Sequence, residues 1–143
     1  MGTNENVELV KSGMEAFNAH DWDRFFALSD ESLVNYAPDL EEPLKGLEGY
    51  RERFETNFAA FPDQHIETVR VFGAGDWVVF EGIFTGTHRG AFTGPGGQEI
   101  PATNKRVELP VALVFKIEGG KATEQHDYYD NLAFLSQIGM APE

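Results

Sequence analysis

Residues 77–88 read WVVFEGIFTGTH, and this run sets the fold class. Branched and aromatic residues dominate it, which is typical of a long β-strand, and Gly82 and Gly86 within it predict a bend or bulge. Working outward, alternation or β-rich composition predicts strands over 65–72, 107–117 and 122–129, with a hairpin turn at 118–121. Weaker alternation adds a short strand over 32–37.

Helical periodicity governs the other half of the chain. Apolar residues recur at three- and four-residue steps, which predicts helices over about 4–18, 22–29 and 47–60. A closing helical turn is expected over 131–138. Helices followed by long antiparallel strands predict an α+β fold. Because long strands twist and coil, we expect a cone-shaped, mostly antiparallel sheet, with three N-terminal helices packed on its concave face in an α+β barrel.

Composition narrows the class of protein. The 143 residues suit one domain spanning 1–143. The formal net charge of −13 argues against nucleic acid or an anionic membrane as partner, and the absence of Cys excludes disulfides and thiolate nucleophiles. No window is apolar enough to span a membrane, and residues 1–11 do not resemble a signal peptide. We therefore expect a cytoplasmic protein.

Twelve Phe residues indicate either a thick core or a pocket lined with rings. We expect a pocket for a small apolar organic molecule. Its expected lining residues are Phe17, Tyr36, Tyr50, Phe54, Phe58, Phe80, Phe84 and Tyr128. For the four of these on helices, ordinary core packing is the alternative interpretation.

The last strand carries an unusual number of polar residues. Alternation places Glu124, His126, Tyr128 and Asp130 on one face, and Gln125, Asp127 and Tyr129 on the other. A carboxylate beside a His in an apolar pocket suits general acid/base chemistry, which makes Asp130 and His126 candidate catalytic residues. The alternative is that this face lies in water and that Asp130 caps the next helix.

His88 ends the long strand and shares its face with Phe80 and Phe84. If those rings line the cone, His88 lies at its mouth as a third catalytic candidate, although a structural role is the alternative. No metal site is expected, because the four His residues are scattered. No cofactor is expected either, because residues 94–97 lack the Lys-Ser/Thr of a phosphate-binding loop.

Several short motifs occur in a characteristic order. They are Phe61-Pro62-Asp63, Gly75-Asp76-Trp77-Val78-Val79, Gly86-Thr87-His88-Arg89-Gly90, Gly120-Lys121-Ala122-Thr123-Glu124, Asp127-Tyr128-Tyr129-Asp130 and Leu135-Ser136-Gln137-Ile138-Gly139. In this set the chain resembles the SnoaL-like polyketide cyclases, of the superfamily of nuclear transport factor 2 (NTF2) and ketosteroid isomerase. The resemblance implies a cone of curved mixed sheet and three helices, often a homodimer through the sheet. It also implies a cofactor-free aldol closure in which an Asp is the acid/base, matched here to Asp130 with Asp127 as the fallback. His88 matches a His common in the Gly-Thr-His run.

Three functions remain open from the sequence. The first is a cofactor-independent enzyme that performs aldol-type cyclisation or isomerisation of a polyketide-like or steroid-like substrate, with epoxide hydrolysis as a related option. The second is a non-catalytic carrier of an apolar metabolite. The third is a partner-binding domain that uses its exposed sheet. A carboxylate inside a dry pocket would favour the enzyme, and a filled cone would favour the third.

Overall fold

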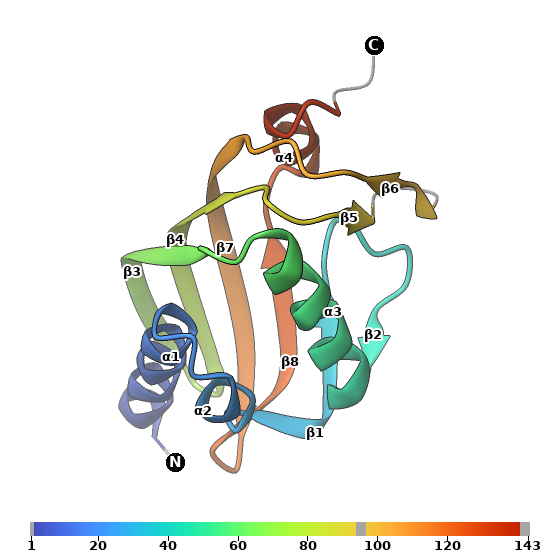
Figure 1. Cartoon of the computed structure of the whole chain (residues 1–143). Helices are drawn as coiled ribbons and strands as arrows, with labels where there is room; N and C mark the ends of the chain where they lie inside the picture. Colours follow the sequence, from blue (N-terminus) through green and yellow to red (C-terminus); the bar gives the residue numbers. More distant parts are fainter. Residues whose placement is uncertain (1, 94–96, 141–143) are drawn as a thin grey trace.

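The computed structural model describes residues 2–93 and 97–140 (Figure 1). Along the chain, the N-terminal part holds α1 (Thr3–Asn18), α2 (Trp22–Phe26), β1 (Ser29–Tyr36), β2 (Leu44–Lys45) and α3 (Leu47–Ala60). The remainder holds β3 (His65–Ala74), β4 (Trp77–Thr87), β5 (Phe92–Thr93), β6 (Glu99–Ile100), β7 (Arg106–Glu118), β8 (Lys121–Tyr128) and α4 (Asn131–Gln137).

One sheet organises the molecule. Its strand order is β2-β1-β8-β7-β4-β3, and β1 pairs with β8 in parallel while the other pairs are antiparallel. The expected α+β class and mostly antiparallel curved sheet are confirmed. Two details were wrong. Strands β2 and β3 remain as edges, so the sheet does not close into a barrel, and the closing turn expected over 131–138 is a fourth helix, α4, beyond the three counted.

The helices cover the concave side of the sheet (Figure 1). Helix α1 packs against β3 and β4, α3 crosses β1, and α4 lies against the end of β7. Inward-facing residues such as Val78 and Phe80 are fully buried, whereas the neighbouring Trp77 is partly exposed on the outer face. Within the described residues, no helix is long and apolar enough to cross a membrane.

The bend expected at the glycines of β4 has a local cause. The pairing of β3 with β4 shifts register between Thr68 and Arg70, opposite Gly82. A Cβ at Gly82 would stand 2.5 Å from the carbonyl oxygen of Glu67, so a larger residue would push the two strands apart. The bulge therefore depends on glycine at this position, and it helps the sheet curve around its contents.

Candidate active site

A cavity of about 180 Å³ lies between the concave face of the sheet and the helices, and it is partly open to solvent. Most of its lining is aromatic or aliphatic. The expected lining residues Phe17, Tyr50, Phe54 and Phe84 contribute to it, and sequence reasoning did not include Phe61, Phe92 and Phe134. The many Phe residues therefore line the cavity as well as fill the core.

Four other expected lining residues lie elsewhere. Tyr36 and Tyr128 are exposed on the outer face of the sheet, because their neighbours Asn35 and Asp127 point inward. Phe58 packs its ring against His20 and Trp22, outside the cavity. Phe80 is fully buried in the core below the cavity floor and is absent from the lining.

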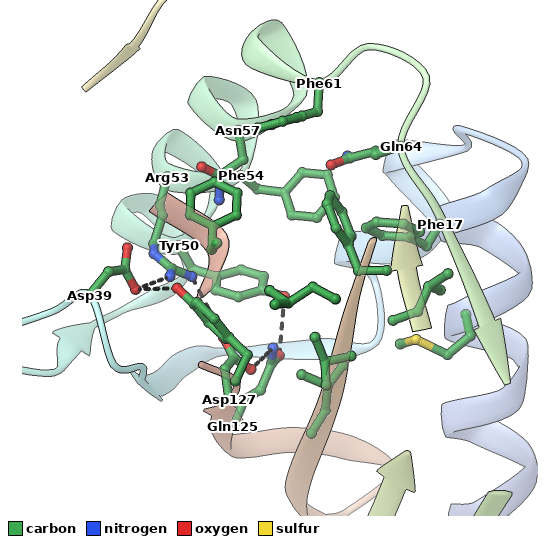
Figure 2. Close-up of a pocket in the computed structure, with 18 of the residues that line it drawn as sticks. Phe17, Asp39, Tyr50, Arg53, Phe54, Asn57, Phe61, Gln64, Gln125 and Asp127 are labelled. Atoms are coloured by element: carbon green, nitrogen blue, oxygen red, sulfur yellow. Dashed lines mark hydrogen bonds and ion pairs between the residues drawn. The ribbon is translucent and has the colours of Figure 1, made fainter. Parts of the chain in front are cut away.

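The polar centre of the cavity is Asp127 on β8, which is 8% exposed. Its Oδ1 accepts a hydrogen bond from Gln125 Nε2 at 2.8 Å, and its Oδ2 accepts one from Asn35 Nδ2 at 3.2 Å. The Gln125 amide is held in turn by Tyr50, whose hydroxyl donates to Oε1 at 3.1 Å. Figure 2 shows Tyr50, Gln125 and Asp127 converging on one side of the cavity.

Arg53 on α3 joins this cluster to a second carboxylate. Its guanidinium donates to Asp39 Oδ1 at 2.6 Å and to Asn35 Oδ1 at 3.2 Å, and it lies 3.6 Å from Asp127 Oδ2. Tyr129 also donates to Asp39, at 2.9 Å. Arg53 Nε is buried without a hydrogen-bond partner among the described residues, so its N–H stays unused.

Burial shifts the protonation equilibria of these groups. It raises the pKa of Asp127, although hydrogen bonds from Gln125 and Asn35 and the charge of Arg53 partly offset the effect. Burial likewise raises the pKa of Tyr50 and of Tyr129, so both phenols stay protonated and donate. For Arg53, burial opposes the charge, but the carboxylates of Asp39 and Asp127 outweigh it and raise its pKa. The site thus combines a fixed cation with a carboxyl group that binds a proton more readily than usual.

Asp130 and His126 do not enter the cavity. The side chain of Asp130 is the N-cap of α4 and accepts from the Ala133 N–H at 2.9 Å, as the structural alternative expected. His126 lies on the outer face of the sheet, where its ring stacks on Tyr36 with centroids 4.4 Å apart. The carboxyl group that does face the cavity is the fallback residue, Asp127.

His88 is fully buried but does not line the cavity. Its Nδ1 accepts from the Thr103 N–H at 3.3 Å and lies 2.9 Å from the Thr103 hydroxyl. The His88 N–H donates to the Lys105 carbonyl, and the His88 carbonyl accepts from the Asn104 N–H. His88 therefore holds the end of β4 against the residues just before β7. Phe92, which lines the cavity, lies in the segment between them. Burial lowers the pKa of His88, and a hydrogen bond with the Gly90 backbone partly offsets this effect. The lowered pKa favours the neutral ring, which the contact with Thr103 needs.

Sequence reasoning missed Asn35, Asp39, Arg53, Gln64 and Gln125 as site residues. One signal was available, because Gln125 shares strand parity with Asp127. The other missed residues lie on β1, on α3 and in the loops beside them, far from Asp127 in the sequence. In the described chain, no group of three or more His, Asp or Glu is arranged to hold a metal ion.

A curved, mostly antiparallel sheet with helices over an apolar cavity is the NTF2-like fold. Residues 8–138 match the family model for SnoaL-like polyketide cyclases, and the chain belongs to that family. No curated protein matches it in sequence.

Solved structures agree on the fold. A SnoaL-like candidate polyketide cyclase from Jannaschia sp. CCS1 superposes with a TM-score of 0.85 at 24% identity, covering 99% of this chain and 95% of that one. AclR, a candidate hydroxylase from Streptomyces galilaeus, gives a TM-score of 0.84 at 22% identity over 99% and 85% of the two chains. An LEH-like epoxide hydrolase from M. tuberculosis gives 0.72 at 18% identity over 95% and 90%. The family and these neighbours favour a small-molecule enzyme in general.

Proposed function

We propose that this protein is a cofactor-independent enzyme that removes and returns a proton next to a carbonyl group of a small apolar substrate. Such a step underlies both aldol-type cyclisation and double-bond isomerisation. The observation that supports it best is Asp127, a buried carboxyl group with a raised pKa that faces an apolar cavity. A base whose pKa lies nearer the working pH transfers protons in both directions more readily.

In the proposed step, ionised Asp127 takes a proton from the carbon beside the carbonyl. The C–H bonding pair moves toward the carbonyl oxygen, which becomes an enolate. The positive charge of Arg53, which lines the cavity 3.6 Å from Asp127 Oδ2, suits that developing negative charge. In a cyclisation, the enolate carbon then attacks a second carbonyl within the substrate, and the oxygen of that carbonyl takes the proton back from Asp127. In an isomerisation, Asp127 returns the proton to a different carbon of a conjugated enolate. No external oxidant or reductant is required.

The neighbours of Asp127 act as positioning residues. Gln125 and Asn35 hold its two oxygens from opposite sides, and Tyr50 fixes the direction of the Gln125 amide. Surrounding rings such as Phe54 and Phe84 exclude water, which strengthens every electrostatic interaction within the site. The carboxylate therefore stays in one orientation before and after proton transfer.

Hydrogen–deuterium exchange into a simple ketone tests this proposal. We expect the wild-type protein to accelerate exchange at the acidic carbons of β-tetralone in D₂O, measured by proton NMR. Asp127→Asn should abolish the acceleration and retain binding of the ketone. Asp130→Asn is the matched control and should retain exchange, because Asn also caps helices.

The alternative function, a carrier of an apolar metabolite, predicts a different outcome. Wild type and Asp127→Asn would then bind β-tetralone equally, and neither would accelerate exchange. That result would reject the enzyme and leave the carrier.

We further propose that the protein forms a homodimer through the outer face of the sheet. A cross-strand row on this face runs from Tyr36 through His126 and Val114 to Val79. Tyr128 beside it is 57% exposed and Trp77 is 39% exposed. Exposed aromatic and branched residues on one continuous sheet face are typical of a surface that a partner covers. A second copy of the chain offers a face of the same shape, as isologous dimers require.

A further inference from the structure

Gln64 is a polar residue of the cavity lining that the proposed proton transfer does not use. It lies between α3 and β3, lines the cavity and is 3% exposed. Its Nε2 has no hydrogen-bond partner within residues 2–93 and 97–140. A buried amide donor without an acceptor destabilises the folded protein, so its presence calls for a reason.

The backbone around Gln64 is held firmly. Its N–H donates to the Phe61 carbonyl at 3.1 Å, and its carbonyl oxygen lies 3.2 Å from His20 Nε2. Two residues on, Ile66 exchanges a pair of hydrogen bonds with the Asn18 side chain, at 2.8 and 2.9 Å. The end of α1 thus fixes this segment in place, and the Gln64 amide is directed into the cavity rather than left free to turn to solvent (Figure 2).

Gln64 and Asp127 lie on opposite sides of the hollow (Figure 2). In the sheet, β3 and β8 are separated by β4 and β7. Three inter-strand spacings amount to roughly 14 Å along the sheet surface, and the curvature of the sheet shortens the direct path. Aromatic and aliphatic side chains such as Phe54, Phe84 and Val111 line the cavity that these two residues share. A ligand that reaches both amide and carboxyl must be elongated and apolar in its middle.

We propose that Gln64 binds an oxygen atom at the end of the ligand remote from Asp127. The ligand is then an elongated ketone, apolar in its middle, with a second hydroxyl or carbonyl oxygen at its far end. The inference rests on the proposed function for the identity of the reacting end only. The amide supplies specificity: an analogue without the remote oxygen leaves Nε2 unpaired, while one with it satisfies that donor.

Binding measurements with matched probes test the inference. The probes are β-tetralone, its three-ring linear homologue, and the derivative of each that carries a hydroxyl on the ring edge farthest from the ketone. Titration calorimetry gives the affinity ratio of hydroxylated to parent ketone in both series. In at least one series we expect the wild-type protein to prefer the hydroxylated ketone by about tenfold, the value of one hydrogen bond. Gln64→Leu, of similar volume, should reduce that ratio to about one.

Thermal unfolding of the ligand-free protein supplies a second readout. Gln64→Leu removes an unpaired amide from an apolar wall, so we expect an unchanged or higher Tm. A structural amide would instead lower the Tm when removed. Gln98→Leu, an exposed change outside the cavity, is the control for both measurements.

Two results would overturn the inference: a wild-type protein with no preference for either hydroxylated ketone, or a Gln64→Leu protein that keeps the preference. Both readouts concern binding and stability, so they do not depend on turnover. If β-tetralone exchange fails while Gln64 still governs the hydroxyl preference, the proposed enzyme is rejected and the binding role stands. If exchange succeeds and the preference is absent, Asp127 keeps its role and Gln64 loses its own.

Discussion

The hydroxyl of Tyr50 on α3 donates to Gln125 on β8 at 3.1 Å, and this bond turns the amide NH₂ of Gln125 toward Asp127. The two residues are 75 positions apart in the chain. Because Gln125 Oε1 accepts from Tyr50, a flipped amide would turn its oxygen toward Asp127 and lose the hydrogen bond that it donates to that carboxyl group. Tyr50 on α3 thereby favours the orientation in which Gln125 presents its NH₂ group, not its oxygen, to Asp127 on β8.

Tyr50→Phe tests this relay. The change leaves Gln125 Oε1 buried without its donor, and we expect a loss of about 1–3 kcal/mol in the free energy of unfolding. Urea denaturation of the variant measures the loss. Tyr36→Phe removes a hydroxyl on the outer sheet face and should stay within about 0.5 kcal/mol of wild type. Equal effects of the two changes would mean that the relay contributes nothing.

The raised pKa of Asp127 predicts how stability varies with pH. Because the folded protein holds this proton more tightly than the unfolded chain does, the contribution of Asp127 to stability is full below the unfolded pKa of about 3.9. It is lost as pH rises through the higher folded value. We expect the stability of wild type relative to Asp127→Asn to fall as pH rises over this window, in urea titrations at a series of pH values. A stability difference between wild type and Asp127→Asn that stays constant over this window would contradict the prediction.

Arg53 should hold down the pKa of Asp127, since its charge lies 3.6 Å from Oδ2. Arg53→Met removes that charge, so the pKa of Asp127 should rise further above its ordinary range. Carbon-13 NMR titration of the Asp side-chain carboxyls measures this directly, with Asp127→Asn to assign the signal. The control is Arg51→Met on the exposed side of the same helix, where the guanidinium lies over the Phe26 ring. It should leave the Asp127 titration unchanged.

His88 should make the protein sensitive to mild acid. The buried ring accepts from Thr103 only when neutral, and burial lowers its pKa in the folded state. The unfolded chain therefore takes up a proton first, and stability falls as pH drops below about 6.5. His88→Gln keeps an acceptor but does not titrate, so its stability should depend less on pH in this window. His65→Gln, at an exposed His, should behave as wild type.

The proposed dimer is tested by a charge in the centre of the sheet face. Val114 lies between His126 and Val79 in the cross-strand row, and Val114→Lys should convert a dimer into a monomer in size-exclusion chromatography with light scattering. Ala27→Lys, on the exposed end of α2, is the control and should remain dimeric. A wild-type protein that elutes as a monomer at micromolar concentration would reject the dimer.

The fold was accessible from sequence because its signals are local. Helical and alternating periods placed the three early helices and the five long or medium strands within a few residues of where they lie. Helix periodicity also identified Phe17, Tyr50 and Phe54 as facing the sheet. It failed at Phe58, one turn further along α3, where His20 and Trp22 already cover the ring.

The site was harder to predict, and β8 shows the reason. Alternation separated the residues of β8 correctly into two sets, one for each face of the sheet. Both sets are polar, so the sequence did not indicate which set points inward. Because Tyr128 is aromatic, its face of the strand was predicted to line the pocket. That face is in fact the outer one, and it is partly apolar. Helical periodicity likewise gave no sign that Arg53 belongs to the site. Its actual surroundings, Asp39, Asn35 and Asp127, come together only through tertiary structure.

The parallel pairing of β1 with β8 carries a consequence for the newborn protein. Asn35 and Asp127 are 92 positions apart, and they meet only after the last strand has been synthesised and inserted beside the first. Until then, the apolar cavity is incomplete and lacks the carboxyl group of Asp127. Any ligand that depends on Asp127 can therefore bind only after β8 has paired with β1, and pairing of strands so far apart in sequence is typical of slow folding steps.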